Sequence, residues 1–494
     1  MLLKSTRDDK RTLPALEAVL KGISEDGGLF IPEKLPRLSM EDIEKNKNLS
    51  YQELAARILN MFFEDIPLKD MGEITKEAYS SFDCDEIIPL KKLSEKDFVL
   101  ELWHGPTLAF KDVALQILPG LMAKALEQKG IGEDVLILTA TSGDTGKAAL
   151  EGFCDAPRVK IVVFYPEDGV SDMQKLQMVT QEGKNTFVVA VKGNFDDTQN
   201  GVKEIFTDND AAKNLLEKGY VLSSANSINI GRLTPQIVYY FWSYICLLNR
   251  GEISLGEKIN IVVPTGNFGN ILAAYYAFLM GLPVNKFICA SNTNRVLTDF
   301  FKRKEYTLKD RKFVKTMSPS MDILISSNLE RLIADMVKDD GAVRKLMEDL
   351  KQTESYDIEK YLDTDIVNRF YANWASEEQT KGAIRGTFDE YGYLIDPHTA
   401  VGKKVCDDYY AETKDETPCI IASTANPYKF AGSVLEAFGE ETEGLNAFEL
   451  SEKLSEKTKT NIPKKISELT GKEILHNETI EKDKMLEAIL RALE

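Results

Sequence analysis

The sequence predicts an α/β protein built on open, mostly parallel sheets. From about residue 97 onward, short apolar runs of strand length alternate with amphipathic helical stretches, a pattern typical of βαβ units. The expected strands cover residues 135–141, 159–165, 186–193, 220–225, 258–266 and 418–425. With 494 residues, the chain is also longer than a single hydrophobic core usually supports, so we expect more than one structural unit.

Changes of sequence texture divide the chain into three parts. Residues 1–95 combine helical stretches with a turn-rich segment at 26–38, and we expect a separate N-terminal domain there. Residues 96–440 carry the alternation of strands and helices and form the expected catalytic core. Residues 441–494 are rich in charged side chains with helical spacing, which predicts a C-terminal helical segment.

Composition and charge disfavour several classes of function. The formal net charge of -18, from 61 basic and 79 acidic residues, argues against nucleic acid as a main partner. The six cysteines form no CxxC pair and the three histidines lack metal-binding spacing, so we expect no metal site. The start of the chain lacks a signal-peptide core, and no apolar run is long enough to span a bilayer. These features predict a soluble, cytoplasmic protein without a membrane partner.

Ligands of open parallel sheets bind at the carboxyl ends of the strands, so the strand-to-helix turns are the places to examine. Residues 264–270, PTGNFGN, form one such turn, in which Gly266 and Gly269 allow the backbone to approach a ligand closely. The helix that begins near Asn270 points free N–H groups at the turn, and this arrangement favours an anion such as phosphate. A tight turn whose glycines serve only packing is the alternative.

Residues 141–147, TSGDTGK, form a second turn of the same kind. Ser142 and Thr145 add hydroxyl groups, and Lys147 places a positive charge in the first helical turn, which makes a nearby anion more plausible. N-capping by Ser142, Asp144 or Thr145 is the alternative, but a cap accounts for one of these residues and not for the cluster. The two turns together predict two anion sites, one for a cofactor phosphate and one for a substrate anion.

A third polar cluster lies at the end of the strand expected at 220–225. Asn226, Ser227 and Asn229 offer amide and hydroxyl groups there, and Arg232 in the following helix can bind a phosphate with two parallel hydrogen bonds. Taken alone, the cluster is better explained by a capped turn followed by a surface arginine.

Lys111 lies within residues 104–118, HGPTLAFKDVALQIL, which we interpret as a helix with an apolar stripe. The lysine stands at the N-terminal edge of that stripe, next to Phe110. Desolvation and a nearby positive helix end would lower its pKa and provide the free amine that Schiff-base chemistry requires. A lysine that extends its ammonium group from an amphipathic helix to water is the alternative.

The motifs and their order resemble threonine synthase, a family of fold-type-II enzymes that depend on pyridoxal 5'-phosphate (PLP). The matching segments span nearly the whole chain and are residues 5–7, 26–32, 102–116, 139–150, 226–236, 264–270, 396–402 and 423–430. The resemblance implies two open, twisted, mostly parallel sheet subdomains plus an N-terminal domain, with about residues 120–235 as the smaller, mobile subdomain. It also implies a cytoplasmic monomer or homodimer that converts O-phosphohomoserine and water to threonine and phosphate.

The resemblance also implies roles for individual residues. Lys111, beside Phe110, matches the catalytic lysine that carries PLP, and Thr424 matches the residue that hydrogen-bonds the pyridine nitrogen. The residues that match the loop around the PLP phosphate are Gly266, Asn267, Phe268, Gly269 and Asn270. The residues that match the substrate-binding segments are Ser142, Asp144, Thr145, Asn226, Ser227, Asn229 and Arg232.

One position departs from the family pattern, and two other functions fit part of the sequence. Asn426 stands where family members often carry histidine, which we expect to affect fine tuning of the pocket rather than activity.

A related PLP enzyme, such as a threonine or serine dehydratase or a cysteine-synthase-like enzyme, shares the fold and the lysine, but Arg232 and its neighbours argue for a phosphorylated substrate. A metabolite-binding protein that kept the fold without catalysis is disfavoured by Lys111 and residues 266–270. We expect His398 to be structural.

Overall fold

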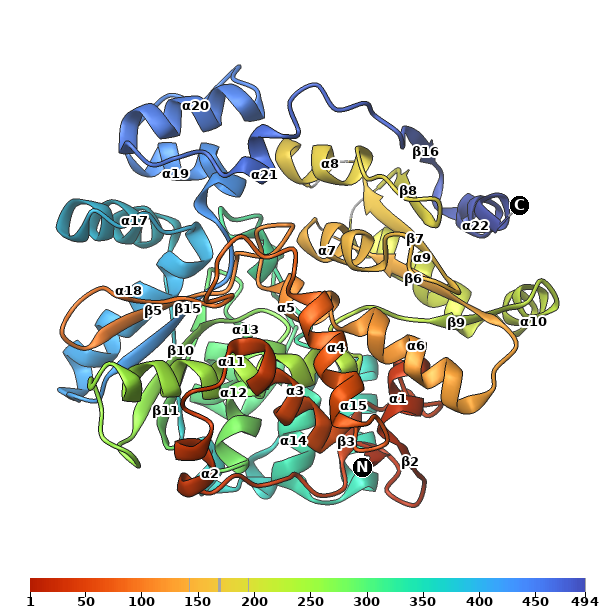
Figure 1. The fold of residues 1–494 in the computed structure, drawn as a ribbon, viewed down its shortest axis with the longest axis horizontal. Coiled ribbons are helices and arrows are strands. Elements are labelled where there is room, and N and C mark those ends of the chain that lie inside the picture. The colour runs from red at the N-terminus through yellow and green to blue at the C-terminus, as the bar shows by residue number, and fades with distance from the viewer. Residues whose placement is uncertain (142, 168–169, 194, 494) are drawn as a thin grey trace.

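The computed structural model describes residues 1–141, 143–167, 170–193 and 195–493, and two sheets form its centre (Figure 1). In these residues the larger sheet has six strands, in the order β14 (Phe370–Trp374), β11 (Val284–Ser291), β10 (Ile259–Pro264), β15 (Cys419–Ser423), β5 (Asp97–Glu101) and β4 (Leu90–Lys92). The smaller sheet has five, in the order β16 (Glu478–Ile480), β8 (Thr186–Val191), β7 (Val159–Pro166), β6 (Asp134–Ala140) and β9 (Tyr220–Ser223). Every neighbouring pair is parallel except β4 and β5. The predicted α/β class with mostly parallel sheets is confirmed.

Helices follow the strands as the alternation predicted. Those along the larger sheet and its connections are α5 (Lys111–Leu115), α6 (Leu118–Lys129), α11 (Ile230–Asn249), α12 (Gly269–Leu279), α13 (Val296–Arg303), α14 (Leu329–Val337), α15 (Asp340–Thr353), α16 (Thr364–Val367), α17 (Glu377–Tyr391), α18 (Pro397–Thr413) and α19 (Ala431–Ala437). Those beside the smaller sheet are α7 (Asp144–Phe153), α8 (Asp172–Val179), α9 (Phe195–Thr207) and α10 (Asn209–Glu217). Short 3-10 turns are η1 (Pro319–Met321), η2 (Glu359–Tyr361), η3 (Pro427–Phe430) and η4 (Lys482–Lys484), and β12 (Glu305–Thr307) pairs with β13 (Ser355–Asp357). Across the described ranges, no helix is both long enough and apolar enough to cross a bilayer.

The two ends of the chain both join the central sheets. The N-terminal part contains the antiparallel sheet β2 (Thr12–Pro14), β1 (Leu2–Ser5) and β3 (Phe30–Pro32) and the helices α1 (Ala15–Lys21), α2 (Met40–Lys45), α3 (Tyr51–Phe62) and α4 (Leu68–Ala78). Its last strand, β4, pairs with β5 of the larger sheet, so the expected boundary at residue 95 stays a prediction. The C-terminal part has the expected helices α20 (Ala447–Thr458), α21 (Lys464–Ser467) and α22 (Met485–Leu493). It also contributes β16 to the smaller sheet, beside β8 (Figure 1), so the prediction of an entirely helical segment was incomplete.

The stretch 104–118 is not the continuous helix that we expected. Helix α5 begins only at Lys111, and residues 104–110 form a turn in which Leu108 has a left-handed φ of 60°. The side chain of Asp112 fixes this turn, because its carboxylate accepts hydrogen bonds from the backbone N–H of Thr107 at 2.8 Å and from the hydroxyl of Thr107 at 2.7 Å. Lys111 therefore stands in the first turn of a short helix, directly after a rigid loop.

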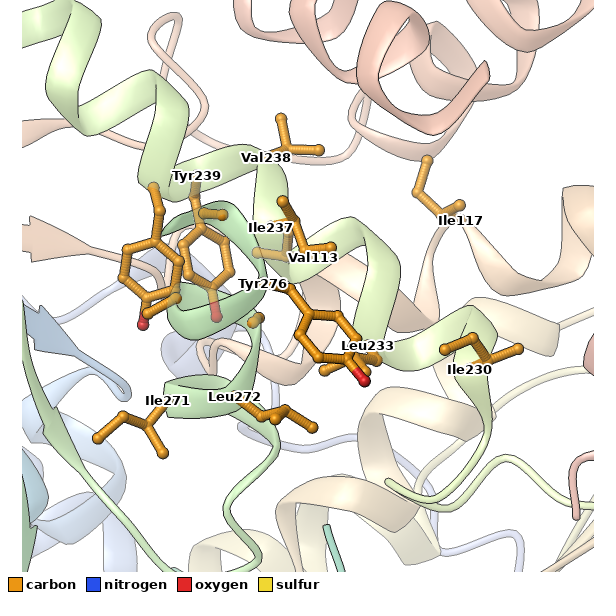
Figure 2. Close-up of a cluster of buried hydrophobic side chains, with 14 of the residues drawn as sticks. Val113, Ile117, Ile230, Leu233, Ile237, Val238, Tyr239, Ile271, Leu272 and Tyr276 are labelled. Atoms are coloured by element: carbon orange, nitrogen blue, oxygen red, sulfur yellow. The ribbon is translucent and has the colours of Figure 1, made fainter. Parts of the chain in front are cut away.

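Helix α11 connects the parts of the structure that carry the candidate site. Figure 2 shows its buried side chains, among them Leu233 and Ile237, packed between Val113 of α5 and Ile271 and Tyr276 of α12. The first turns of α5 and α12 hold Lys111 and the end of the 264–270 loop. Because α11 contacts both helices, its apolar face fixes the position of the lysine relative to that loop.

We expect Leu233→Ala to destabilise the protein by about 2–5 kcal/mol, since the side chain is 1% exposed and its removal leaves a cavity. The matched control is Leu255→Ala, because Leu255 is 43% exposed and loses little contact on truncation. The measurement is the urea midpoint of unfolding for both variants. Equal shifts of the midpoint would contradict the view that α11 is a central packing element.

Candidate active site

Lys111 is held next to Thr424 by a short backbone bridge. Ala109 and Ala425 form an isolated antiparallel bridge, in which the N–H of Phe110 donates to the carbonyl of Thr424 at 2.9 Å. On the other side of the bridge, the N–H of Asn426 donates to the carbonyl of Leu108 at 3.0 Å. Thr424 follows the carboxyl end of β15, so the bridge brings the lysine and the threonine to the ligand-binding edge of the larger sheet.

Asp144 joins Lys111 to a second buried lysine. Its carboxylate lies 3.4 Å from the Nζ of Lys111 and 2.8 Å from the Nζ of Lys429, and the side chain of Lys429 has 0% exposure. Gln174 donates to the same carboxylate at 2.9 Å, and the hydroxyl of Ser320 lies 3.4 Å from it. Because Asp144 starts α7 beside the smaller sheet, whereas Lys111 and Lys429 follow strands of the larger one, this cluster connects the two sheets.

Burial and the charges in this cluster change the pKa values of Lys111 and Asp144. Burial lowers the pKa of Lys111 below its ordinary value; Asp144 opposes this shift, and the positive charges of Lys429 and Arg232 reinforce it. Burial acts to raise the pKa of Asp144, but the charges of Lys429 and Lys111 outweigh it and hold that pKa well below its usual range. Asp144 is therefore ionised at neutral pH, and the amine of Lys111 loses its proton more readily than a lysine in water.

The 264–270 loop forms a cradle, by which we mean a turn whose hydrogen-bond donors are free to bind an anion. Phe268 precedes α12 with a left-handed φ of 65° and provides no side-chain cap, so the first N–H groups of the helix remain available. The Nδ2 of Asn270 is buried and lacks a hydrogen-bond partner within the described residues. Its Oδ1 accepts from the hydroxyls of Tyr239 (2.8 Å) and Tyr240, which orients the amide. A free, buried donor at an uncapped helix N-terminus fits a phosphate group.

Glycine is required at the start of the same loop. A Cβ atom at Gly266 would lie 2.9 Å from the backbone oxygen of Ser320, closer than carbon and oxygen can approach. The hydroxyl of Ser326 donates to the carbonyl of Gly266 at 2.6 Å and ties the loop to the segment before α14. These contacts hold the loop in one conformation before a ligand binds.

Arg232 supplies a second point for an anion. Its side chain is buried, its Nη1 donates to the carbonyl of Ala225 at 2.9 Å, and its Nε has no partner in the described part of the chain. Burial lowers the pKa of Arg232 to about 10, so it still carries a charge at neutral pH. Asn226 and Ser227 lie half-buried just before it on the loop that leads into α11.

Several predicted residues have other roles in the structure or cannot be placed. Both amide hydrogens of Asn229 are used at 2.9 Å, by the carbonyls of Val19 and Ser224, and its Oδ1 caps α11, so the amide of Asn229 is structural. Lys147, expected to favour an anion, is instead paired with Glu151 at 2.9 Å and with Gln181. Thr145 lies in the first turn of α7, as expected. Ser142 falls outside the described residues.

Lys429 is a residue of the site that the sequence did not predict, although it lies in the matching segment 423–430. The signal that could have identified it is a lysine within a stretch whose neighbours are otherwise apolar or small. Its Nζ also donates to the carbonyl of Thr107 at 2.7 Å, so it contacts the turn before Lys111 as well as Asp144.

His398 is structural, as expected. Its Nδ1 lies 2.7 Å from Asp396, which caps α18, and its Nε2 accepts from the N–H of Ser320 at 3.1 Å. Within the described ranges, no three His, Cys, Asp or Glu side chains gather as metal ligands would.

We expect Lys429→Met to raise the pKa of Lys111, because the substitution removes a like charge from the cluster. The measurement is the pH dependence with which an amine reagent labels Lys111 in the protein without added ligand, followed by peptide mass analysis. Lys429→Arg retains the charge and serves as the control. An unchanged labelling profile in Lys429→Met would mean that Lys429 does not act on Lys111 electrostatically.

Comparisons with known proteins agree with this geometry. Three family models match in chain order: Threonine synthase N terminus over residues 3–79, Pyridoxal-phosphate dependent enzyme over 86–424, and Threonine synthase, C-terminal over 399–483. The threonine synthase of Pseudomonas aeruginosa is 40% identical over 438 residues, which cover 88% of this chain and 89% of the relative. The crystal structure of PLP-bound threonine synthase from Brucella melitensis superposes with a TM-score of 0.86 at 35% identity, covering 100% of this chain and 98% of that one.

A further relative differs in length. Threonine synthase-like 1 of Homo sapiens is 45% identical over 433 residues, which are 85% of this chain but only 57% of the human protein. The present chain thus spans little more than half the length of that relative. The matches together cover the N-terminal domain, both sheets and the C-terminal segment, and the chain belongs to the threonine synthase family of pyridoxal-phosphate-dependent enzymes.

Proposed function

We propose that the protein is a threonine synthase that converts O-phospho-L-homoserine and water to L-threonine and phosphate, the last step of threonine biosynthesis. The observation that supports this substrate most directly is Arg232, a buried cation whose Nε lacks a partner among the described atoms. A buried guanidinium with an unsatisfied Nε is costly, and a phosphate group would satisfy it. This second anion site is separate from the cradle at 266–270, so it suits a substrate that carries its own phosphate.

PLP fits the remaining features of the site. Lys111 would hold it covalently, the loop 266–270 and the free amide of Asn270 would bind its phosphate, and the hydroxyl of Thr424 would face its ring nitrogen. Phe110 lies beside the lysine, with its ring centroid 4.8 Å from Nζ. When bound, PLP supplies an electron sink for the charge that develops on the substrate carbon atoms.

Lys111 is the group that we expect to move protons. With its pKa lowered by burial, the amine can accept the proton from the substrate Cα and later return it. Asp144, 3.4 Å away, would then hold the resulting ammonium group in place. A second proton leaves Cβ as the γ-phosphate departs, and after protonation at Cγ, water adds at Cβ.

The phosphate group is expelled beside Arg232, which would stabilise the charge that builds up on its oxygen atoms. The backbone N–H of Asn226 is bound to Ser224 at 3.2 Å, so this loop has a defined shape before substrate arrives. Asn226 and Ser227 would add polar contacts to the substrate. Asp144 and Thr145 lie in the first turn of α7. The hydroxyl of Thr145 would contact a substrate anion, whereas the ionised Asp144 would act through Lys111.

We expect the wild-type protein with PLP to release phosphate from O-phosphohomoserine and to form threonine in equal amount. Lys111→Ala should lower the rate by at least about 1,000-fold, because it removes both the cofactor attachment and the proton carrier. Lys91→Ala, at an exposed lysine, is the control. Formation of 2-oxo acid from threonine or serine without phosphate release would favour a dehydratase instead. A near wild-type rate in Lys111→Ala would exclude the proposed mechanism.

We expect Arg232→Met to raise KM for O-phosphohomoserine by at least about tenfold, because the charged hydrogen bonds to the phosphate are lost. Arg232→Lys retains the charge but lacks the planar fork, so its KM should lie between those of the wild type and Arg232→Met. The measurement is the initial rate of phosphate release over a range of substrate concentrations, at saturating PLP. If KM is unchanged in Arg232→Met, then Arg232 does not bind the substrate phosphate.

A further inference from the structure

The first turn of α14 contacts both of the loops assigned to phosphate groups. The backbone N–H of Asn328 donates to the carbonyl of Asn267 at 3.0 Å, within the 264–270 loop. The Nδ2 of the same residue donates to the carbonyl of Ser227 at 3.2 Å, within the 226–232 loop. The Oδ1 of Asn328 accepts from Arg331, so the backbone N–H and both polar atoms of the side chain have partners in this buried residue.

Arg331, three residues further along α14, makes additional contacts that support the connection between the two loops. Its side chain is 0% exposed, its Nη2 donates to the carbonyl of Ile228 at 2.6 Å, and its Nε donates to the carbonyl of Phe30 at 3.0 Å. Its partners are thus uncharged oxygen atoms from three separate segments of the chain. Burial lowers the pKa of Arg331 to about 10, which leaves a cation directly behind the 226–232 loop.

Glu330, between these two residues, faces a different part of the protein. Its carboxylate accepts from Arg7 at 2.8 Å through both Nε and Nη2, and it also accepts from the hydroxyl of Thr6 at 2.5 Å. It therefore docks the segment after β1 on α14, and among the described residues it makes no hydrogen bond or ion pair with either loop. Glu330 therefore helps to attach α14 to the protein, whereas Asn328 and Arg331 connect the two loops.

We propose that Asn328 and Arg331 are positioning residues that hold the cofactor loop and the substrate loop at a fixed separation. Neither side chain touches the expected ligands, since their hydrogen bonds are made to the backbone of the loops. The substrate part of this inference rests on the proposed function, whereas the cofactor part rests on membership of the PLP-dependent family.

The test compares Asn328→Ala with Glu330→Gln, two changes on the same helical turn. We expect Asn328→Ala to raise the dissociation constant of PLP for the cofactor-free protein by about tenfold. The carbonyl of Ser227 loses its donor and Arg331 loses an acceptor, so the residue whose backbone N–H binds Asn267 is no longer held in place. The dissociation constant is measured by quenching of tryptophan fluorescence. Binding of inorganic phosphate to the holoenzyme, measured by 31P line broadening, should weaken as well. Glu330→Gln should lower the thermal midpoint and leave both dissociation constants within about twofold of wild type.

Arg331→Lys provides a second variant in case Asn328→Ala fails to fold. It keeps the buried charge but cannot reach three acceptors, so we expect weaker binding of both probes. If PLP and phosphate bind both variants as tightly as they bind the wild type, the inference is overturned. It is also overturned if Glu330→Gln weakens binding equally, because general loosening of α14 would then explain the effect. Both probes bind without turnover, so a failure of threonine formation in the wild type would count against the proposed function alone.

Discussion

Asp144 lies buried between the amines of Lys111 and Lys429, and this contact brings the two sheets together at the site. One carboxylate between two lysines, with Arg232 nearby, leaves an excess of positive charge in a region shielded from water. That excess favours anionic ligands and disfavours the protonated form of Lys111. A buried ion pair is stable only when its remaining hydrogen-bonding capacity is used, and Gln174 fulfils this requirement for Asp144.

On the side of the larger sheet, two contacts fix the positions of the residues around this cluster. The bridge between Ala109 and Ala425 fixes Lys111 against Thr424, and α11 fixes α5 against α12. The smaller sheet contributes Asp144 through the first residue of α7, which follows β6 directly. A ligand bound at Lys111 would therefore contact residues from both sheets, and its charge would alter the pairing of Asp144 with the two lysines.

Local patterns were sufficient to predict strands β6, β7, β8, β9, β10 and β15 and the turn after β10, because each depends on residues adjacent in sequence. Strands β4, β5, β11 and β14 of the larger sheet were not predicted. The role of Lys111 rests on the family resemblance and stays a prediction. Asn229 and Lys147 were misjudged, since two of their actual partners, Val19 and Gln181, lie 210 and 34 positions away in the sequence. The same limit applies to Lys429, whose pairing with Asp144 spans 285 positions. Strand β16 was missed because three residues carry no periodic signal, and its pairing with β8 arises only in the folded chain. The assignments of Thr424 and of the substrate residues stay predictions.

The central claim is that Lys111, and not the more deeply buried Lys429 beside it, forms the covalent bond with PLP. The most direct measurement is borohydride reduction of the protein loaded with PLP, followed by peptide mass mapping of the attachment site. The account predicts a single modified peptide that contains Lys111. Attachment at Lys429, or the absence of any modified peptide from a protein with bound PLP, would contradict it.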